Sequence, residues 1–396
     1  MRKNSILYPI VMIFFITSCF SDKFGKGGLP FIDVRKKYPE KEILLTDIAD
    51  VTYLHLSTAN DDYLFSGWIN CITENTIVVV DNVSNSILFF SKDGNPKSRF
   101  NHYGQGPEDY LRTNYLIYDE TADELFICYG RNAIKVYSST GIYKRKITLP
   151  EGITITDLID FDDRSLFFYD WTIERDRSVA LSRRTDLPAV DKYVIPFYRI
   201  SKTTGEILDY VELPSTQLSL GFIYDGRWIS AAPRKFSAQS PEGVLLWSPG
   251  TDTVFLYSGD KPLTPVLYQT PSLVSLNPKE ILGLCLDRGQ YQFIQIFTIR
   301  EGNANFPAKY YMRNKKTGEI VRQKFILPDY RDKEFVISGL GNIAGKEYKN
   351  GYLVELFLDE LKQAYRENKL GGNLKELVAT LNEDEDYTVF MLVEFK

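Results

Sequence analysis

The sequence predicts an all-β fold, a six-bladed β-propeller of four-stranded antiparallel blades, and three observations support this. Short alternating apolar segments recur along nearly the whole chain, as is typical of half-buried strands. Glycine-containing turns recur with them at a period of roughly 50–60 residues, close to the size of a propeller repeat. Aromatic residues make up 14% of the 396 residues, enough to fill interfaces between packed sheets.

The repeat is clearest in residues 78–94 and 125–141, each of which reads as strand, turn, strand, turn. In both segments an isoleucine stands seven positions before the final glycine, and an aromatic residue stands four positions before it. The glycine supplies the positive φ that a tight hairpin needs. Looser copies end at Gly205 and Gly318, and another ends near Lys261.

We expect six blades from these copies. Their approximate ranges are 60–101, 111–149, 153–214, 218–269, 280–328 and 334–396. Residues 51–56 alternate before the first blade, and residues 387–395 form the last apolar segment. We therefore expect the N-terminal strand to complete the last blade, because this closes the ring and removes open sheet edges.

A small helical insertion is expected in the last blade at about 355–381. Leu358, Leu361 and Tyr365 fall on one face at helical spacing. We expect one propeller domain over residues 41–396, insertion included.

The first residues predict export. Arg2 and Lys3 precede the apolar run 6–16, which is too short for the ~20 residues of a membrane-spanning helix and is typical of a signal peptide. Cys19 follows in the order of a bacterial lipobox, whose cysteine thiol takes a diacylglyceryl group. We predict a lipoprotein signal peptide at 1–18 and lipidation of Cys19. The alternative is an ordinary secretory signal with an incidental cysteine.

The acyl chains on Cys19 would attach the protein to a membrane. Residues 19–40 are expected to form a flexible tether. Phe20 rather than aspartate follows the cysteine, so nothing argues for retention at an inner membrane. The predicted location is the outer membrane of a Gram-negative bacterium, facing the periplasm or the cell surface.

The three other cysteines, Cys71, Cys128 and Cys285, each lie in an apolar, strand-like run. No CxxC pair occurs, so neither a zinc knuckle nor a redox pair is supported. We expect buried thiols. One disulfide stays open as an alternative, because an oxidising envelope permits it.

Residues 78–110 resemble an NHL- or TolB-like propeller repeat. The mature chain as a whole resembles the six-bladed β-propeller lipoproteins of Bacteroidetes. The resemblance includes the opening segment 45–56, the loop Gly-Gln-Gly-Pro-Glu-Asp-Tyr at 104–110, and the helical insertion before the final strand. Asp109 stands where that family more often has glutamate. The resemblance implies a fold and an envelope location, and it implies no particular reaction.

Candidate ligand-binding residues surround the glycine-rich loop 104–110, which would meet a ligand if it lines a mouth of the central channel. They are His102, Gln105, Glu108 and Tyr110. The alternative is a structural loop, in which glycine permits a tight reversal and Pro107 restricts it. The other histidine, His55, is expected to be packed or at a strand edge.

Carboxylates cluster at Asp160, Asp162 and Asp163 and at residues 383–386. Such groups bind calcium or act as an acid–base pair, but both clusters also read as turns. No nucleophile elbow occurs, and we predict no catalytic residue, metal or cofactor. Lys and Arg total 47 against 52 Asp and Glu, with the signs interleaved, which argues against a nucleic-acid partner.

The sequence therefore favours a non-enzymatic, envelope-anchored module that binds a ligand, an envelope protein or a glycan. The alternative is a propeller hydrolase or lyase that acts on a polysaccharide or lactone through channel carboxylates, with or without calcium.

Overall fold

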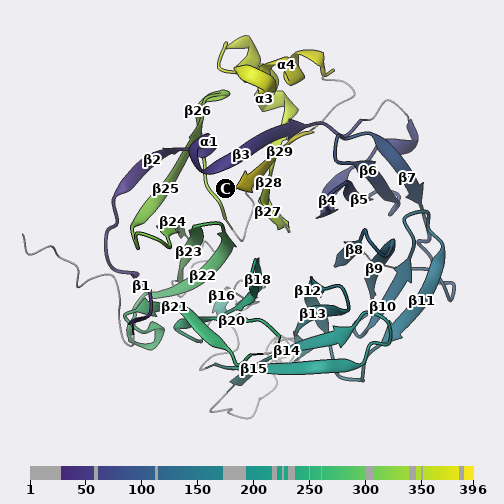
Figure 1. The fold of residues 1–396 in the computed structure, drawn as a ribbon, viewed down its shortest axis with the longest axis horizontal. Coiled ribbons are helices and arrows are strands. Elements are labelled where there is room, and N and C mark those ends of the chain that lie inside the picture. The colour runs from purple at the N-terminus through teal and green to yellow at the C-terminus, as the bar shows by residue number, and fades with distance from the viewer. Residues whose placement is uncertain are drawn as a thin grey trace, which may run out of the picture.

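Six β-sheets stand around a central axis (Figure 1). The computed structural model describes residues 28–57, 61–111, 115–172, 193–215, 221–224, 227–230, 237–248, 250–259, 261–299, 307–338, 345–348, 351–382 and 388–396. Within these residues, six sheets have four or more strands, and β16 (Gly221–Tyr224) and β17 (Arg227–Ser230) form a separate pair. The predicted all-β, six-bladed fold is confirmed.

Blades one to three follow one another along the chain. Blade one contains β4 (Gly67–Ile72), β5 (Thr76–Asp81), β6 (Ile87–Ser91) and β7 (Pro96–Phe100). Blade two contains β8 (Leu116–Asp119), β9 (Glu124–Tyr129), β10 (Ala133–Tyr137) and β11 (Tyr143–Thr148). Blade three contains β12 (Ile155–Asp162), β13 (Ser165–Asp170), β14 (Tyr193–Ser201) and β15 (Ile207–Ser215).

Blades four to six complete the ring. Blade four contains β18 (Ser237–Ser240), β19 (Gly243–Leu246), β20 (Thr253–Tyr257) and β21 (Thr264–Thr270). Blade five contains β22 (Lys279–Arg288), β23 (Tyr291–Ile299), β24 (Ala308–Asn314) and β25 (Ile320–Leu327), with β26 (Tyr330–Phe335) beside β25. Blade six contains β27 (Gly345–Tyr348), β28 (Gly351–Phe357), β29 (Thr388–Phe395) and β3 (Ala49–Leu54). Short 3-10 turns lie at Asp61–Tyr63 and Leu273–Ser275.

The ring closes through the N-terminal strand, as the sequence predicts. Strand β3 pairs antiparallel with β29, from Phe390 opposite Leu54 to Phe395 opposite Ala49. The last blade therefore contains both the beginning and the end of the chain. Because its fourth strand comes from the N-terminal segment, the ladder that holds blade six together also holds the ring closed.

Two further N-terminal strands, β1 (Phe31–Asp33) and β2 (Glu40–Leu44), correct the expectation of a flexible tether over residues 19–40. They pair in parallel with the outer strands β21 and β25 of blades four and five, along the left of Figure 1. Ile32 and Val34 are 0% and 1% exposed within a hydrophobic cluster. The tether expectation is therefore wrong for 31–34, because an outer strand has an unpaired edge that extended chain can join. Residues 1–27, with the predicted signal peptide and Cys19, lie outside the described residues.

The helical insertion of blade six forms α3 (Leu358–Arg366) and α4 (Gly372–Thr380). The buried face of α3 contains Leu358, Leu361 and Ala364, whereas Tyr365 is partly exposed. Ala364 thus takes the place on the buried face that the sequence assigns to Tyr365. Of the helices that the structure describes, none is long and apolar enough to cross a lipid bilayer.

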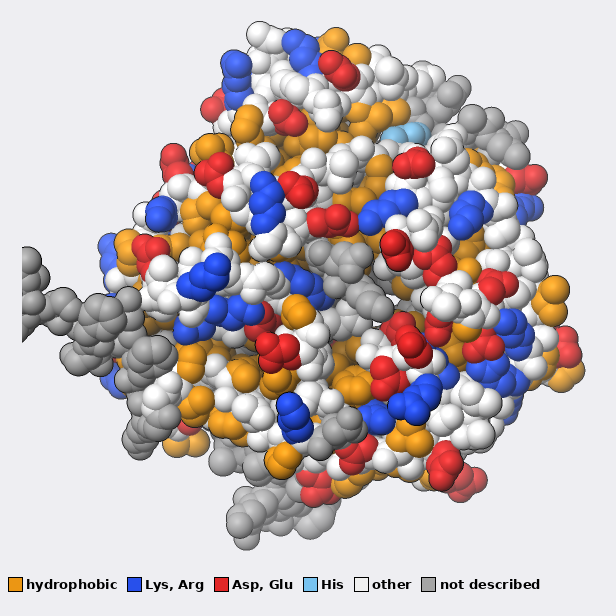
Figure 2. Space-filling model, in the orientation of Figure 1, with side chains coloured by type: hydrophobic (Ala, Val, Ile, Leu, Met, Phe, Trp, Pro, Cys, Tyr) orange, Lys and Arg blue, Asp and Glu red, His pale blue; other side chains and the backbone are white. Residues whose placement is uncertain are grey.

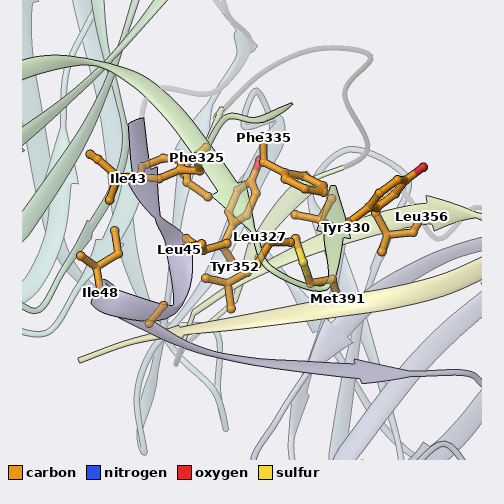
Figure 3. Packing of buried hydrophobic residues seen from close by; sticks show 14 of the residues in the cluster. Ile43, Leu45, Ile48, Phe325, Leu327, Tyr330, Phe335, Tyr352, Leu356 and Met391 are labelled. Carbon is orange, nitrogen blue, oxygen red and sulfur yellow. The ribbon is translucent and has the colours of Figure 1, made fainter. Parts of the chain in front are cut away.

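The largest hydrophobic cluster joins the N-terminal segment to blades five and six. Helix α1 (Leu45–Ile48) places Leu45 near Phe325 of blade five and Tyr352 of blade six (Figure 3). Leu374 and Val378 of α4 belong to the same cluster. The insertion is therefore part of the core of the last two blades.

Aromatic rings pack between the blades. Phe89 of blade one meets Tyr118 of blade two edge to face, with ring centroids 5.2 Å apart. Phe167 of blade three stacks on Tyr257 of blade four at 5.1 Å. Such contacts use much of the aromatic content, because neighbouring sheets bury their faces against each other.

Cys71 and Cys128 carry thiols and form no disulfide in the structure. Burial raises the pKa of the Cys128 thiol to about 12, which favours the protonated thiol at neutral pH. The backbone of Cys285 lies in β22, and its side chain is outside the described residues.

Candidate functional site

The glycine-rich loop joins β7 of blade one to β8 of blade two. Side chains of blade two hold its backbone by hydrogen bonds. Lys135 donates from Nζ to the carbonyl of Pro107 at 3.0 Å and also to the carbonyl of Asp109. The hydroxyl of Tyr137 donates to the carbonyl of Glu108 at 2.5 Å. Three successive carbonyl groups of the loop therefore accept hydrogen bonds from one strand, β10.

The two glycines of this loop make room for the carboxylate of Asp109. The backbone N–H of Gly106 donates to Oδ2 of Asp109 at 2.8 Å. A Cβ on Gly104 or Gly106 would lie only 2.4 or 2.7 Å from that oxygen. The glycines therefore serve the internal packing of the loop.

The four predicted ligand-binding residues do not form one exposed site. Tyr110 is fully buried, its hydroxyl donates to the carbonyl of Asn85 at 2.7 Å, and burial raises its pKa to about 12. His102 is half-buried, stacks on a tyrosine ring of blade two and has Nε2 2.9 Å from the carbonyl oxygen of Gly141. Gln105 and Glu108 are exposed at the surface of the loop.

Two of the three blade-three carboxylates, Asp160 and Asp162, are engaged in structural contacts, and Asp163 is exposed. Oδ1 of Asp160 lies 2.8 Å from Nζ of Lys202. Asp162 accepts hydrogen bonds from Oγ of Ser165 at 2.7 Å and from the N–H of Arg164 at 2.9 Å. Although burial raises it, these hydrogen bonds give Asp162 a pKa below its ordinary value.

The blade-three carboxylates form no metal site among the described residues. No three His, Cys, Asp or Glu side chains gather among these residues as metal ligands would, and residues 383–386 lie outside them.

A cavity of about 780 Å³ opens elsewhere, at the junction of blades six and one, and we call it the seam groove. Its principal lining residues are His55, Trp68, Glu355, Phe357, Asp359 and Phe390. They come from the end of β3, the start of β4, the end of β28 with the start of α3, and the start of β29. No local sequence pattern marks this site, because these four segments meet only when the ring closes.

The strand directions place the groove on one face of the ring. Successive strands of a blade are antiparallel. In every blade the first strand therefore begins, and the second strand ends, on the same face of the ring. The start of β4 and the end of β28 therefore share this face with the helical insertion. Figure 2 shows hydrophobic side chains at the surface where the insertion, at the top of the view, meets the ring.

The floor of the groove is apolar and its aromatic walls are open to solvent. Leu56 and Phe390 are each 1% exposed, whereas Trp68 is 61% and Phe357 49% exposed. The segment before Trp68 is held by Ser66, whose N–H donates to Oδ1 of Asp81 at 2.8 Å. The groove thus presents two large rings on strand ends that the sheets hold in place.

Glu355 supplies a carboxyl group at the side of the groove. It lies on β28 opposite Phe390 of β29, and its side chain is half-buried. Burial raises the pKa of the Glu355 carboxyl. Among the described residues, no hydrogen bond or ion pair joins its side chain to another group.

The closed ring of six sheets, each of four or more strands, is that of a six-bladed β-propeller. Residues 29–198 match the family DUF5128, which is described as a 6-bladed beta-propeller. No curated protein matches the chain significantly.

Three solved structures show the range of structural similarity. The "Putative exported protein" from Bacteroides fragilis has a TM-score of 0.58 at 16% identity, over 90% of this chain and 98% of that chain. BamB from Moraxella catarrhalis has a TM-score of 0.32 at 9% identity, over 66% and 83% of the two chains. A protein of unknown function from Bacteroides caccae has a TM-score of 0.31 at 13% identity, over 78% and 82%. The first similarity shows a shared fold, and the other two scores are too low to support a conclusion.

Proposed function

We propose that this protein is an exported binding module, anchored in the outer membrane of a Gram-negative cell by a lipid on Cys19, and that its ligand occupies the seam groove. The anchor rests on the order of basic residues, apolar run and cysteine at the N-terminus. The name of the Bacteroides fragilis protein, which shares the fold, agrees with export. An envelope protein or a glycan remains the expected source of the ligand.

The exposed rings of the seam groove are the observation that carries this proposal. Trp68 and Phe357 leave large apolar surfaces in water beside a concave site. Exposed aromatic patches of this kind mark binding surfaces. The volume of about 780 Å³ lies within the range of ~300–1,000 Å³ that is usual for ligand pockets.

A thermal-shift screen tests the proposal. The mature protein and the double variant Trp68→Ala/Phe357→Ala are heated with fractions of native envelope extract and with purified glycans. We expect at least one fraction to raise the melting temperature of the wild type and to leave the variant unchanged, because a ligand stabilises the folded state to which it binds.

Ile142→Ala provides a matched control. Ile142 is an exposed apolar residue in the turn between β10 and β11 of blade two, away from the groove. This variant should respond to every fraction as the wild type does. If no fraction separates the wild type from the groove variant, the groove is not the binding site.

A further inference from the structure

The described lining of the seam groove is acidic. Two carboxylates, Glu355 and Asp359, line it together with the imidazole of His55, and no described lysine or arginine does so. Several carboxylates elsewhere in the ring lie beside cations. For example, Glu124 is 2.6 Å from Arg145, and Glu280 is 2.6 Å from Lys309.

Glu355 is the residue that most needs a positive partner. Burial without a counter-charge disfavours the ionised carboxylate, which agrees with the raised pKa of this group. Burial removes part of the hydration that stabilises the Glu355 carboxylate. A cation that enters the groove would replace this lost stabilisation. The affinity of the groove for a cation therefore includes relief of this penalty.

The aromatic walls favour the same kind of ligand. The faces of tryptophan and phenylalanine rings carry partial negative charge and attract ammonium and guanidinium groups. Trp68 and Phe357 are the most exposed rings of the groove. They also offer apolar surface to the uncharged part of a ligand.

We infer that the seam groove binds a small organic cation, an amine- or guanidine-bearing molecule with an apolar body. Its charged group pairs with Glu355, and its apolar part lies against Trp68 and Phe357. This inference rests on the proposed function, because it concerns the same groove, and it names a free small molecule as the ligand in place of the expected envelope protein or glycan. The cavity size favours a free small molecule over the side chain of a docked protein, since it suits a whole drug-sized ligand.

Three probes of nearly equal shape test the charge preference. They are 2-phenylethylammonium, 2-phenylethanol and 3-phenylpropionate, titrated calorimetrically into the wild-type mature protein at pH 7.5. The cation should bind at least about tenfold more tightly than the alcohol, a difference of about 1.4 kcal/mol, and more tightly still than the anion. Equal or tighter binding of the alcohol or the anion, or no binding of the cation, overturns the inference.

Glu355→Gln removes the charge and keeps the shape of the side chain. This variant should lose the preference for the cation and bind the alcohol as the wild type does. Glu242→Gln is the control, because Glu242 is an exposed carboxylate in the turn between β18 and β19 of blade four. If folded Glu355→Gln still prefers the cation over the alcohol, the pairing of the cation with Glu355 is wrong. The comparison of the three probes with the wild type needs no variant.

The two proposals fail differently. In the first case the cation binds no more tightly than the other probes, but an envelope fraction still raises the melting temperature of the wild type and not that of Trp68→Ala/Phe357→Ala. The cation assignment is then wrong, and the groove remains the binding site. If no fraction shifts the melting temperature of the wild type differently from that of the groove variant, and the cation does not bind, both proposals are wrong.

Discussion

Lys202 of blade three lies 2.6 Å from Asp119 of blade two, and both side chains are largely buried. The same ammonium group lies 2.8 Å from Asp160 of its own blade. Although burial lowers it, the hydrogen bonds to Asp119 and Asp160 give Lys202 a pKa above its ordinary value. One cation therefore joins two neighbouring blades.

Removal of this cation should destabilise the ring. Lys202→Met keeps the length of the side chain and leaves two carboxylates without their partner, which costs about 3–5 kcal/mol for a buried pair. The free energy of unfolding in urea measures the loss. Lys309→Met is the control, because Lys309 is 45% exposed in its pair with Glu280 and should cost less than about 1 kcal/mol. Equal losses in the two variants would contradict the interpretation.

Deletion of residues 41–58 should prevent soluble folding. This segment contains β3, whose pairing with β29 completes blade six. Without it, blade six keeps an open edge and the ring is not closed. Soluble yield and circular dichroism report the outcome. Deletion of residues 28–35 is the comparison, since β1 only adds to the edge of blade four and its loss should leave a folded, less stable ring. A folded 41–58 deletion with unchanged stability would refute closure by β3.

Cys19→Ala should release the protein from the membrane fraction. The acyl chains need the thiol of this cysteine for their attachment. Fractionation of cells and incorporation of labelled fatty acid measure the effect. Cys71→Ala serves as the control and should remain in the membrane fraction. Unchanged fractionation of Cys19→Ala would contradict the lipid anchor.

Glu355→Gln should stabilise the protein at high pH but not at low pH. The folded-state pKa of Glu355 is raised, so its favourable contribution is present below the unfolded pKa and is lost as the pH rises through the folded pKa. We expect equal melting temperatures of wild type and variant near pH 4, and a variant about 1–3 °C higher at pH 8. Differential scanning fluorimetry measures both, and Glu242→Gln should show no such trend. A variant that is less stable at pH 8 would mean that Glu355 has a stabilising partner.

Gly106→Ala should destabilise the glycine-rich loop by about 1–3 kcal/mol, because its Cβ would displace the carboxylate of Asp109. In an Asp109→Ala background the same change should cost less than about 0.5 kcal/mol, since the clash is gone. A double-mutant cycle of unfolding free energies gives the coupling. Additive effects would show that the two residues act independently.

Much of the fold follows from local sequence patterns. The repeats ending at Gly94 and Gly141 predict blades one and two closely, since alternation and turn chemistry act within a few residues. The pairing of β3 with β29 could also be predicted, because a propeller ring can close by pairing a strand near the N-terminus with the last strand. The parallel addition of β1 to β21 could not, since it depends on a distant strand edge.

The candidate site depended on contacts that no local pattern reveals. The sequence points to the glycine-rich loop as a place for a ligand, but Lys135 and Tyr137 fasten that loop and Tyr110 is buried. Trp68 and Glu355 are ordinary strand residues in the sequence, and only the closure of the ring brings them to one groove.

By itself, the sequence determined the strand repeat, the number of blades and the predicted export signal, because each of these is a local pattern of apolar residues, turns and cysteine. The tertiary structure decided which residues face a common cavity and which carboxylate is left without a partner. Those properties depend on the burial and spacing of residues from opposite ends of the chain. Glu355 shows the difference, since its environment is set by strands from the two termini that meet at the seam.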